Sequence, residues 1–185
     1  HEYSAGLAAE VWCVCWSRSE ASEQVLWSGG DDGRMCGWDV RVEEPTFVNA
    51  RSHEAGVCSV RWHPSEAHLV ASGAYDDCVR LWDARKPSTP LSKIDVGGGA
   101  WRVRWHPSPR PTAPHLLLVA AMRGGCRVLQ LGESLQWEEV DAMTEHPSEA
   151  LAYGIDWCRD PASLHSPNPL VASCSFYDQS FRTWT

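Results

Sequence analysis

The residue types of a hydrolytic triad occur together in the middle of the chain, as His53, Ser72 and Asp76. In a hydrolase, such a set lets the histidine take a proton from a serine nucleophile while the carboxylate orients the imidazole. Trp82 follows Asp76 by six residues and adds an indole N–H that a serine oxygen can accept. The four residues therefore also fit a structural relay, in which Asp accepts from His, His from Ser and Ser from Trp.

Repetition of the pattern favours the structural interpretation, because a catalytic set is needed only once. The six-residue step from aspartate to tryptophan recurs as Asp32/Trp38, Asp76/Trp82 and Asp178/Trp184. Another tryptophan recurs ahead of each step, at Trp16, Trp62, Trp105 and Trp157. One copy is broken, with Arg123 in place of aspartate and Leu129 in place of tryptophan. A broken position is either a place where function displaces stability or a degenerate repeat.

The repeat predicts the architecture. Equivalent tryptophan positions are 43 to 55 residues apart, a period typical of the blades of a β-propeller with Trp-Asp repeats. In the first copy we expect strands over Val11–Trp16, Gln24–Ser28 and Arg34–Asp39. The sequence thus predicts an all-β WD-repeat β-propeller, a single domain over residues 1–185, with each blade a four-stranded sheet. The predicted blades span residues 1–41, 42–85, 86–131 and 132–185.

Four blades leave the ring short of the usual number. Trp-Asp propellers generally close with about seven blades, so we expect these four to be part of a seven-bladed propeller. A closed four-bladed ring and assembly with another chain are the alternatives. An open wedge of blades would expose two sheet edges and favour aggregation.

Composition limits the classes of function. The chain has 24 acidic residues against 16 lysines and arginines, and its net charge of −8 disfavours nucleic acid as a partner. No apolar run is long enough to span a membrane. The chain lacks a phosphate-binding loop and a dinucleotide fingerprint. Its eight cysteines form no CxxC pair, so we expect reduced thiols in a cytoplasmic or nuclear protein, with no metal and no cofactor.

Several segments are more specific than a generic Trp-Asp blade. They are SGGDDGRMCGWDVR, SHEAGVCSVRWHP, GAYDDCVRLWDARKP, VGGGAWRVRWHP and CSFYDQSFRTW. On these segments the chain resembles the diphthine methyl ester hydrolase family, WD-repeat proteins of diphthamide biosynthesis. The resemblance covers nearly the whole chain and matches the C-terminal part of the family. The chain departs from the family at Ala121–Gly125 and at His146–Gly154, where a family motif is stretched.

This resemblance implies an enzyme that acts on a protein. The family removes the methyl ester from methylated diphthine on elongation factor 2, so elongation factor 2 is the expected partner and the chain an expected carboxylic ester hydrolase. The alternative is a non-enzymatic WD-repeat scaffold that binds a protein on its rim. A polar pocket that contains a base would favour the hydrolase, whereas a pocket lined only by the repeated histidines and aspartates would favour the scaffold.

The implied substrate also carries a trimethylammonium group, which aromatic faces bind well. The candidate substrate-binding residues are Tyr75, Tyr177, Trp101, Tyr153 and Arg123. Both tyrosines of the first pair precede a turn aspartate, and Trp101 and Tyr153 enter inner strands at equivalent positions. The alternative is that Trp101 and Tyr153 pack between blades. Val57 and Val60, two apolar residues three apart, indicate a bulge in the inner strand. A bulge disturbs the alternation of side chains, so the sequence does not assign Trp101 and Tyr153 to a face of the sheet.

Ester hydrolysis also needs a base or nucleophile and donors for the oxyanion. We expect His146 to be the base, because an imidazole titrates near neutral pH and His146 lies near Tyr153 and Asp156. The alternative is that His146 belongs to the structural relay with Asp178. Cys174 is a candidate nucleophile, with a buried structural thiol as the alternative.

Overall fold

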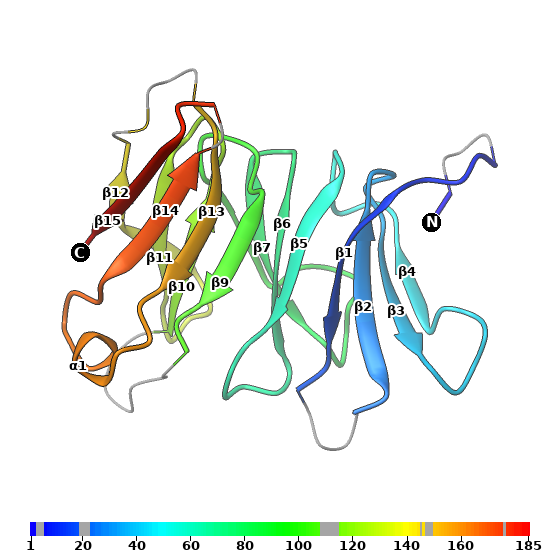
Figure 1. Cartoon of the computed structure of the whole chain (residues 1–185). Coiled ribbons are helices and arrows are strands. Elements are labelled where there is room, and N and C mark those ends of the chain that lie inside the picture. Colours follow the sequence, from blue (N-terminus) through cyan, green and yellow to red (C-terminus); the bar gives the residue numbers. More distant parts are fainter. Residues whose placement is uncertain (3–5, 19–22, 108–114, 145, 147–149, 176) are drawn as a thin grey trace.

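The chain forms four antiparallel sheets that lie side by side in an arc (Figure 1). The computed structural model describes residues 1–2, 6–18, 23–107, 115–144, 146, 150–175 and 177–185. Blade one contains β1 (Val11–Trp16), β2 (Val25–Gly30), β3 (Met35–Asp39) and β4 (Phe47–Asn49). Blade two contains β5 (Val57–Trp62), β6 (Leu69–Ala74), β7 (Cys78–Asp83) and β8 (Ser92–Asp95).

The C-terminal half repeats this arrangement with one strand fewer. Blade three contains β9 (Arg102–Trp105), β10 (His115–Ala120), β11 (Cys126–Leu131) and β12 (Trp137–Met143). Blade four contains β13 (Ala152–Trp157), β14 (Val171–Ser175) and β15 (Ser180–Trp184). Within the described residues this sheet has three strands, where the repeat predicts four. The short helix α1 (Pro161–Leu164), capped by Asp160, connects β13 to β14.

The predicted all-β propeller architecture is confirmed, but the blade boundaries are shifted by one strand. The boundaries predicted from the repeat would assign β4, β8 and β12 to the following blade. In the structure each of them pairs with the strand that precedes it, β4 with β3, β8 with β7 and β12 with β11. An antiparallel strand joined to its predecessor by a short turn pairs with that predecessor, so the sequence repeat and the sheet are out of phase.

Apolar cores fill the spaces between neighbouring blades. Between blades one and two, Trp27 packs edge-on against Trp62, with ring centroids 4.9 Å apart, and the other two interfaces have cores of their own. The inner tryptophans also link blades by hydrogen bonds. The Trp105 indole donates to the carbonyl of Arg61 at 3.1 Å, and that of Trp157 donates to the carbonyl of Arg104 at 2.9 Å. Neighbouring blades therefore depend on each other for apolar burial, and blades two to four also for these indole hydrogen bonds.

Three of the inner strands contain a bulge near their beginning. The register shifts between Val11 and Cys13 in β1, between Val57 and Ser59 in β5, and between Ala152 and Gly154 in β13. The bulge predicted from Val57 and Val60 is confirmed, since both side chains are buried. The extra residues are Trp12, Cys58 and Tyr153. A bulge changes the direction of the residue that it contains, so these three side chains leave the regular alternation of the strand.

All eight cysteines are free thiols in the structure, and Cys36, Cys78 and Cys126 are buried. Among the described residues no helix is long and apolar enough to cross a membrane. Among the residues that the structure describes, no group of three or more His, Cys, Asp or Glu is arranged to hold a metal ion.

Candidate functional site

The complete structural relay occurs in blade one, around a histidine that the sequence pattern does not include. The two ring nitrogens of His1 lie 2.9 Å from Asp32 Oδ1 and 2.9 Å from Ser28 Oγ. The indole of Trp38 donates to the same Ser28 oxygen at 2.7 Å. Both His1 and Asp32 side chains are almost fully buried. Every polar group of the set has a partner, which is the arrangement that a buried structural network requires.

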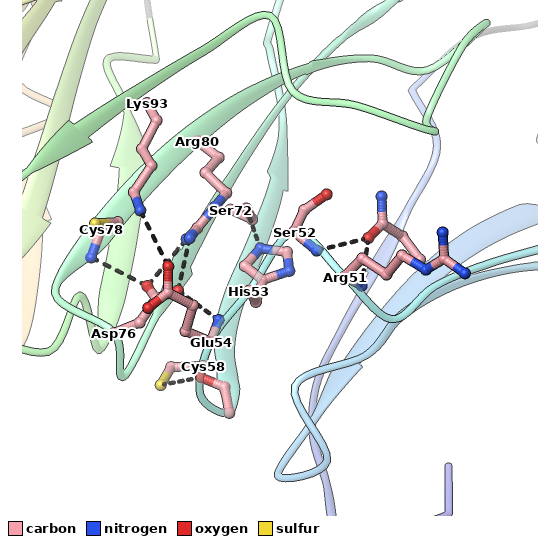
Figure 2. A network of polar contacts seen from close by, with 12 residues as sticks. Arg51, Ser52, His53, Glu54, Cys58, Ser72, Asp76, Cys78, Arg80 and Lys93 are labelled. Atoms are coloured by element: carbon pink, nitrogen blue, oxygen red, sulfur yellow. Dashed lines mark hydrogen bonds and ion pairs between the residues drawn. The ribbon is translucent and has the colours of Figure 1, made fainter.

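In blade two the relay is incomplete, and the predicted link from His53 to Asp76 is wrong. His53 Nε2 lies 2.9 Å from Ser72 Oγ and Trp82 donates to Ser72 at 2.8 Å, but His53 Nδ1 is buried without a partner among the described residues. Figure 2 shows the reason: the two carboxylate oxygens of Asp76 face Arg80, at 2.9 and 2.6 Å. The guanidinium competes successfully because it is always charged and binds a carboxylate through two parallel hydrogen bonds.

The pKa values of this network follow from its burial. Burial and the charge of Arg80 lower the pKa of His53 to about 3, so the ring is neutral at pH 7. Burial raises the pKa of Asp76, but the hydrogen bonds from Arg80 and the Glu54 backbone outweigh it and hold the pKa below its usual range. A neutral histidine without contact to its aspartate lacks the polarised pair on which a triad depends.

His146, the predicted base, occupies the relay position of blade four. Its Nδ1 lies 3.2 Å from Asp178 Oδ2 and 3.0 Å from Ser180 Oγ, and its Nε2 lies 3.2 Å from Ser173 Oγ. The side chain is almost fully buried. This geometry is that of the histidine–serine–aspartate part of the relay, and both ring nitrogens are engaged within it. The Trp184 indole nitrogen is buried without a partner among the described residues. Catalysis by His146 stays a prediction. The neighbouring residues 147–149 lie outside the described part of the chain.

Cys174 lies on the other side of the same sheet. Its neighbour Ser173 is buried and reaches His146, and side chains alternate between the two faces of a strand. Cys174 is accordingly exposed, which corrects the alternative of a buried thiol. His146 cannot activate Cys174 across the sheet, so the two catalytic candidates do not form a pair.

Five aromatic side chains form a continuous row across the four blades. They are Trp12, Tyr75, Trp101, Tyr153 and Tyr177, and we call them the aromatic row. The rings of Trp12, Tyr75 and Trp101 form a triangle, with centroids 5.8, 5.9 and 6.1 Å apart. Tyr153 lies 5.5 Å from Trp101, and Tyr177 lies 6.1 Å from Tyr153. The four aromatic residues predicted from the sequence therefore come together, although their role in binding is still a prediction.

The row is exposed to solvent over much of its length. The relative exposures of Trp12, Tyr75 and Tyr177 are 37%, 43% and 61%. Large rings are usually buried in a folded domain, and a contiguous group of exposed rings is characteristic of binding surfaces. Trp12, Tyr75 and Trp101 also line a hollow of about 560 Å³ together with Asp31, Ala55 and Gly56.

Two positions per blade produce the row. The first is four residues before the inner tryptophan, where Trp12, Cys58, Trp101 and Tyr153 stand. The second directly precedes the turn aspartate or its replacement, where Asp31, Tyr75, Met122 and Tyr177 stand. Neither Trp12 nor Asp31 is among the site residues predicted from the sequence. The four-residue step that relates Trp101 to Trp105 also relates Trp12 to Trp16, and would have identified the first of them.

Arg123 lies beside this region rather than in the row. It is exposed in the turn between β10 and β11, one residue after Met122. Met122 takes the second row position in blade three, and its sulfur lies next to Gly99. A substrate contact by Arg123 stays a prediction.

The antiparallel sheets pack against one another through inner tryptophans. Three of the sheets carry a histidine–serine–aspartate–tryptophan set. These features define the chain as a WD-repeat β-propeller protein. A family model described as "WD domain, G-beta repeat" matches residues 45–83, which is one strand out of phase with the sheets. A chain of the solved "Crystal Structure of Mitotic Checkpoint Complex" superposes with a TM-score of 0.71, over 95% of this chain and 48% of that chain. At 20% identity this similarity shows the fold alone.

The particular relationship is to proteins of diphthamide biosynthesis. The chain is 36% identical over 160 residues to diphthine methyltransferase of Homo sapiens, which covers 85% of this chain and 32% of the human protein. It is 29% identical over 196 residues to diphthine methyltransferase of Saccharomyces cerevisiae, covering 95% of this chain and 48% of the yeast protein. The resemblance predicted from the sequence is thus confirmed, and the chain spans 32% to 48% of the length of these relatives.

Proposed function

We propose that this chain binds the methylated diphthine side chain of elongation factor 2 at the aromatic row and takes part in hydrolysis of its methyl ester. The names of the relatives support a role in diphthamide biosynthesis. The single observation that supports the binding mode is the aromatic row, because faces of Trp and Tyr attract a quaternary ammonium ion.

The hollow at Trp12 suits such a cation. Three rings contribute the electron-rich faces, and Asp31 adds a carboxylate of opposite charge. A cation held over an aromatic face gains about 0.5–2 kcal/mol per contact, depending on how far it is desolvated. Methylated ammonium groups are weakly hydrated, so they are transferred from water to this surface at low cost.

In the proposed reaction a water molecule attacks the ester carbonyl, and the methoxy group leaves as methanol after it takes up a proton. A base must accept the proton of the attacking water. His146 is the base predicted from the sequence, and Asp31 is a second candidate because it lines the hollow beside the rings. The thiols of Cys13 and Cys58 are poor nucleophiles, because burial raises the pKa of each to about 12.

The test is mass spectrometry of elongation factor 2 that carries methylated diphthine. Hydrolysis removes the mass of one methylene group without a methyl donor, whereas methyl transfer to the substrate adds that mass and requires a donor such as S-adenosylmethionine. The human relative is assayed in parallel, with and without the donor. We expect mass loss without a donor, and reduced loss with Trp101→Ala.

The base is identified with two further variants. If Asp31 accepts the proton, Asp31→Asn abolishes the mass loss and His146→Gln retains it in a folded protein; the reverse result identifies His146. Mass gain that requires the donor would contradict the hydrolase proposal.

A non-enzymatic scaffold is the second candidate. The observation in its favour is that the relay histidines, His146 included, are buried in structural networks. The scaffold predicts that elongation factor 2 binds at the aromatic row and that its mass does not change.

A further inference from the structure

Three arginines gather on the inner strands β5 and β9, next to the aromatic row. They are Arg61, Arg102 and Arg104. Two of them, Arg61 and Arg102, line a hollow of about 450 Å³ with Trp12, Trp101, Cys13 and Cys58. The hollow is thus bounded by inner strands of three blades. A cluster of guanidinium groups in a hollow is the usual recognition device for a carboxylate or another oxyanion.

The charges of this cluster are not neutralised within the described chain. None of the ion pairs that the described residues form involves Arg61, Arg102 or Arg104, although the whole chain carries a net charge of −8. The Nε atom of Arg61 is buried without a hydrogen-bond partner there. Buried donors normally have partners, so an unpaired one beside a hollow indicates a missing acceptor.

The electrostatics agree with this geometry. Burial, together with the charges of Arg61 and Arg102, lowers the pKa of Arg104, and the opposing effect of Asp156 does not cancel it. An anion placed among these groups would relieve their mutual repulsion, which is the condition under which a bound anion gains most from a basic cluster.

The hollow that contains the arginines and the hollow that contains Asp31 share two lining residues. Trp12 and Trp101 line the hollow that contains Arg61 and Arg102, and they also line the hollow that contains Tyr75 and Asp31. A small ligand on these two indoles would therefore reach both hollows at once. Its cationic and anionic groups would have to be separated by only a few bonds.

We propose that Arg61 and Arg102 form an anion subsite, so that the chain recognises a zwitterion in which a quaternary ammonium group and a carboxylate lie a few bonds apart, as in the betaines. The inference rests on the proposed function, from which it takes the quaternary ammonium group. It adds recognition of the carboxylate that hydrolysis produces. The ester carbonyl accepts hydrogen bonds from the two guanidinium groups, and the carboxylate released by hydrolysis binds them more strongly because it carries a full charge.

The test is ligand binding, measured by calorimetry and by the indole N–H signals of Trp12 and Trp101 in NMR spectra. The probes are trimethylglycine, its methyl ester, tetramethylammonium and acetate. We expect trimethylglycine to bind about tenfold more tightly than tetramethylammonium, the factor that corresponds to one charge-assisted hydrogen bond. The methyl ester should bind with an affinity between these two, because its carbonyl accepts hydrogen bonds but carries no full charge. Added salt should reduce the advantage of trimethylglycine.

Variants assign the difference to the arginines. Arg61→Gln with Arg102→Gln should abolish the preference for trimethylglycine while leaving tetramethylammonium binding unchanged. Arg85→Gln is the matched control, because Arg85 is exposed and, within the described residues, forms its ion pair with Asp83. Equal binding of trimethylglycine and tetramethylammonium by the unaltered chain would overturn the anion subsite, whether or not the variants fold.

The two proposals can fail separately. Tetramethylammonium binding without a preference for the zwitterion would overturn the anion subsite and leave the proposed function intact. Binding of acetate that perturbs Trp101 through Arg61 and Arg102, with no binding of tetramethylammonium, would contradict the cation site of the proposed function and uphold the anion subsite.

Discussion

The residues that most resemble catalytic groups are buried in structural hydrogen-bond networks. His53, Ser72 and Trp82 are buried in a network whose partners lie within the same blade, and His1 and His146 have equivalent places. The candidate binding residues behave in the opposite way, since they are large rings left in contact with solvent. At the residue scale, exposure distinguishes the two groups better than residue type does.

Gly56 determines where Trp12 lies. A Cβ atom at this position would lie 2.4 Å from one carbon of the Trp12 ring and 2.8 Å from another. We predict that Gly56→Ala displaces Trp12 and weakens tetramethylammonium binding by about threefold to tenfold, the loss of a single cation–π contact. Calorimetry checks the affinity.

The matched control for this prediction is Gly132→Ala. The nearest atom to a Cβ at Gly132 is 3.7 Å away, an ordinary contact. This variant should bind as the unaltered chain does. Unchanged binding by Gly56→Ala, with Trp12 still in contact with Tyr75, would show that the ring is positioned by other groups.

Stability should fall as the pH falls below neutrality. Burial lowers the pKa of both His53 and His63 to about 3. Below the unfolded pKa of about 6.5 the unfolded chain binds protons that the folded chain does not, so each group costs at most about 1.4 kcal/mol per pH unit. Urea denaturation between pH 7 and 5, above the range of the carboxylates, measures this slope.

His63→Asn separates the two contributions. The Nδ1 atom of His63 accepts backbone hydrogen bonds from Ser65 and Glu66, which requires the unprotonated nitrogen. An asparagine oxygen can accept the same bonds but does not titrate. The variant should therefore show a smaller slope. A slope equal to that of the unaltered chain would mean that His63 binds protons alike in the folded and unfolded chains, against the lowered pKa of the folded state.

At the scale of the elements, the inner strands do two things at once. Their C-terminal tryptophans join neighbouring blades, and their N-terminal bulges turn Trp12 and Tyr153 toward the aromatic row. The joining role requires regular strands and the binding role requires an irregular one. The bulge reconciles them because it changes the direction of one residue while the rest of the strand stays paired.

The hydrogen bonds between blades should be measurable in stability. Trp105 and Trp157 donate to carbonyls of the preceding blade, whereas the indole nitrogen of Trp62 is buried without a partner among the described residues. All three substitutions to phenylalanine remove similar apolar volume. Trp105→Phe and Trp157→Phe should therefore destabilise the chain by about 1 kcal/mol more than Trp62→Phe, as determined by urea denaturation. Equal losses would mean that these bonds contribute nothing net.

At the scale of the whole molecule, the two ends of the arc carry apolar surface. On blade one, Val11, Val14 and Val40 are exposed, and on blade four Phe181 has a relative exposure of 70%. Corresponding faces in the interior of the arc are covered by the next blade. Exposed apolar patches of this kind promote association.

We therefore predict that the 185-residue chain self-associates as its concentration rises. Sedimentation velocity over a series of concentrations should show an increasing average mass. Val40→Lys with Phe181→Lys places charges on both faces, away from the aromatic row, and should keep the chain monomeric. A constant monomer mass for the unaltered chain would contradict the prediction.

The sequence by itself determined the repeat, the strands and the aspartate-to-tryptophan step that three blades share. A period of tryptophans, turn residues before each aspartate and alternating strands are local features, so the strand expected over Val11–Trp16 coincides with β1. The resemblance to the relatives was likewise readable from short segments.

Only the tertiary structure decided the rest, because it depends on contacts between residues far apart in the chain. Strand pairing determines the blade to which each outer strand belongs. The buried guanidinium of Arg80 binds Asp76, which therefore does not contact His53. The bulges, together with packing across three blades, brought Trp12 to Trp101. These outcomes result from competition among partners and from the direction of bulged side chains, which no local pattern in the sequence specifies.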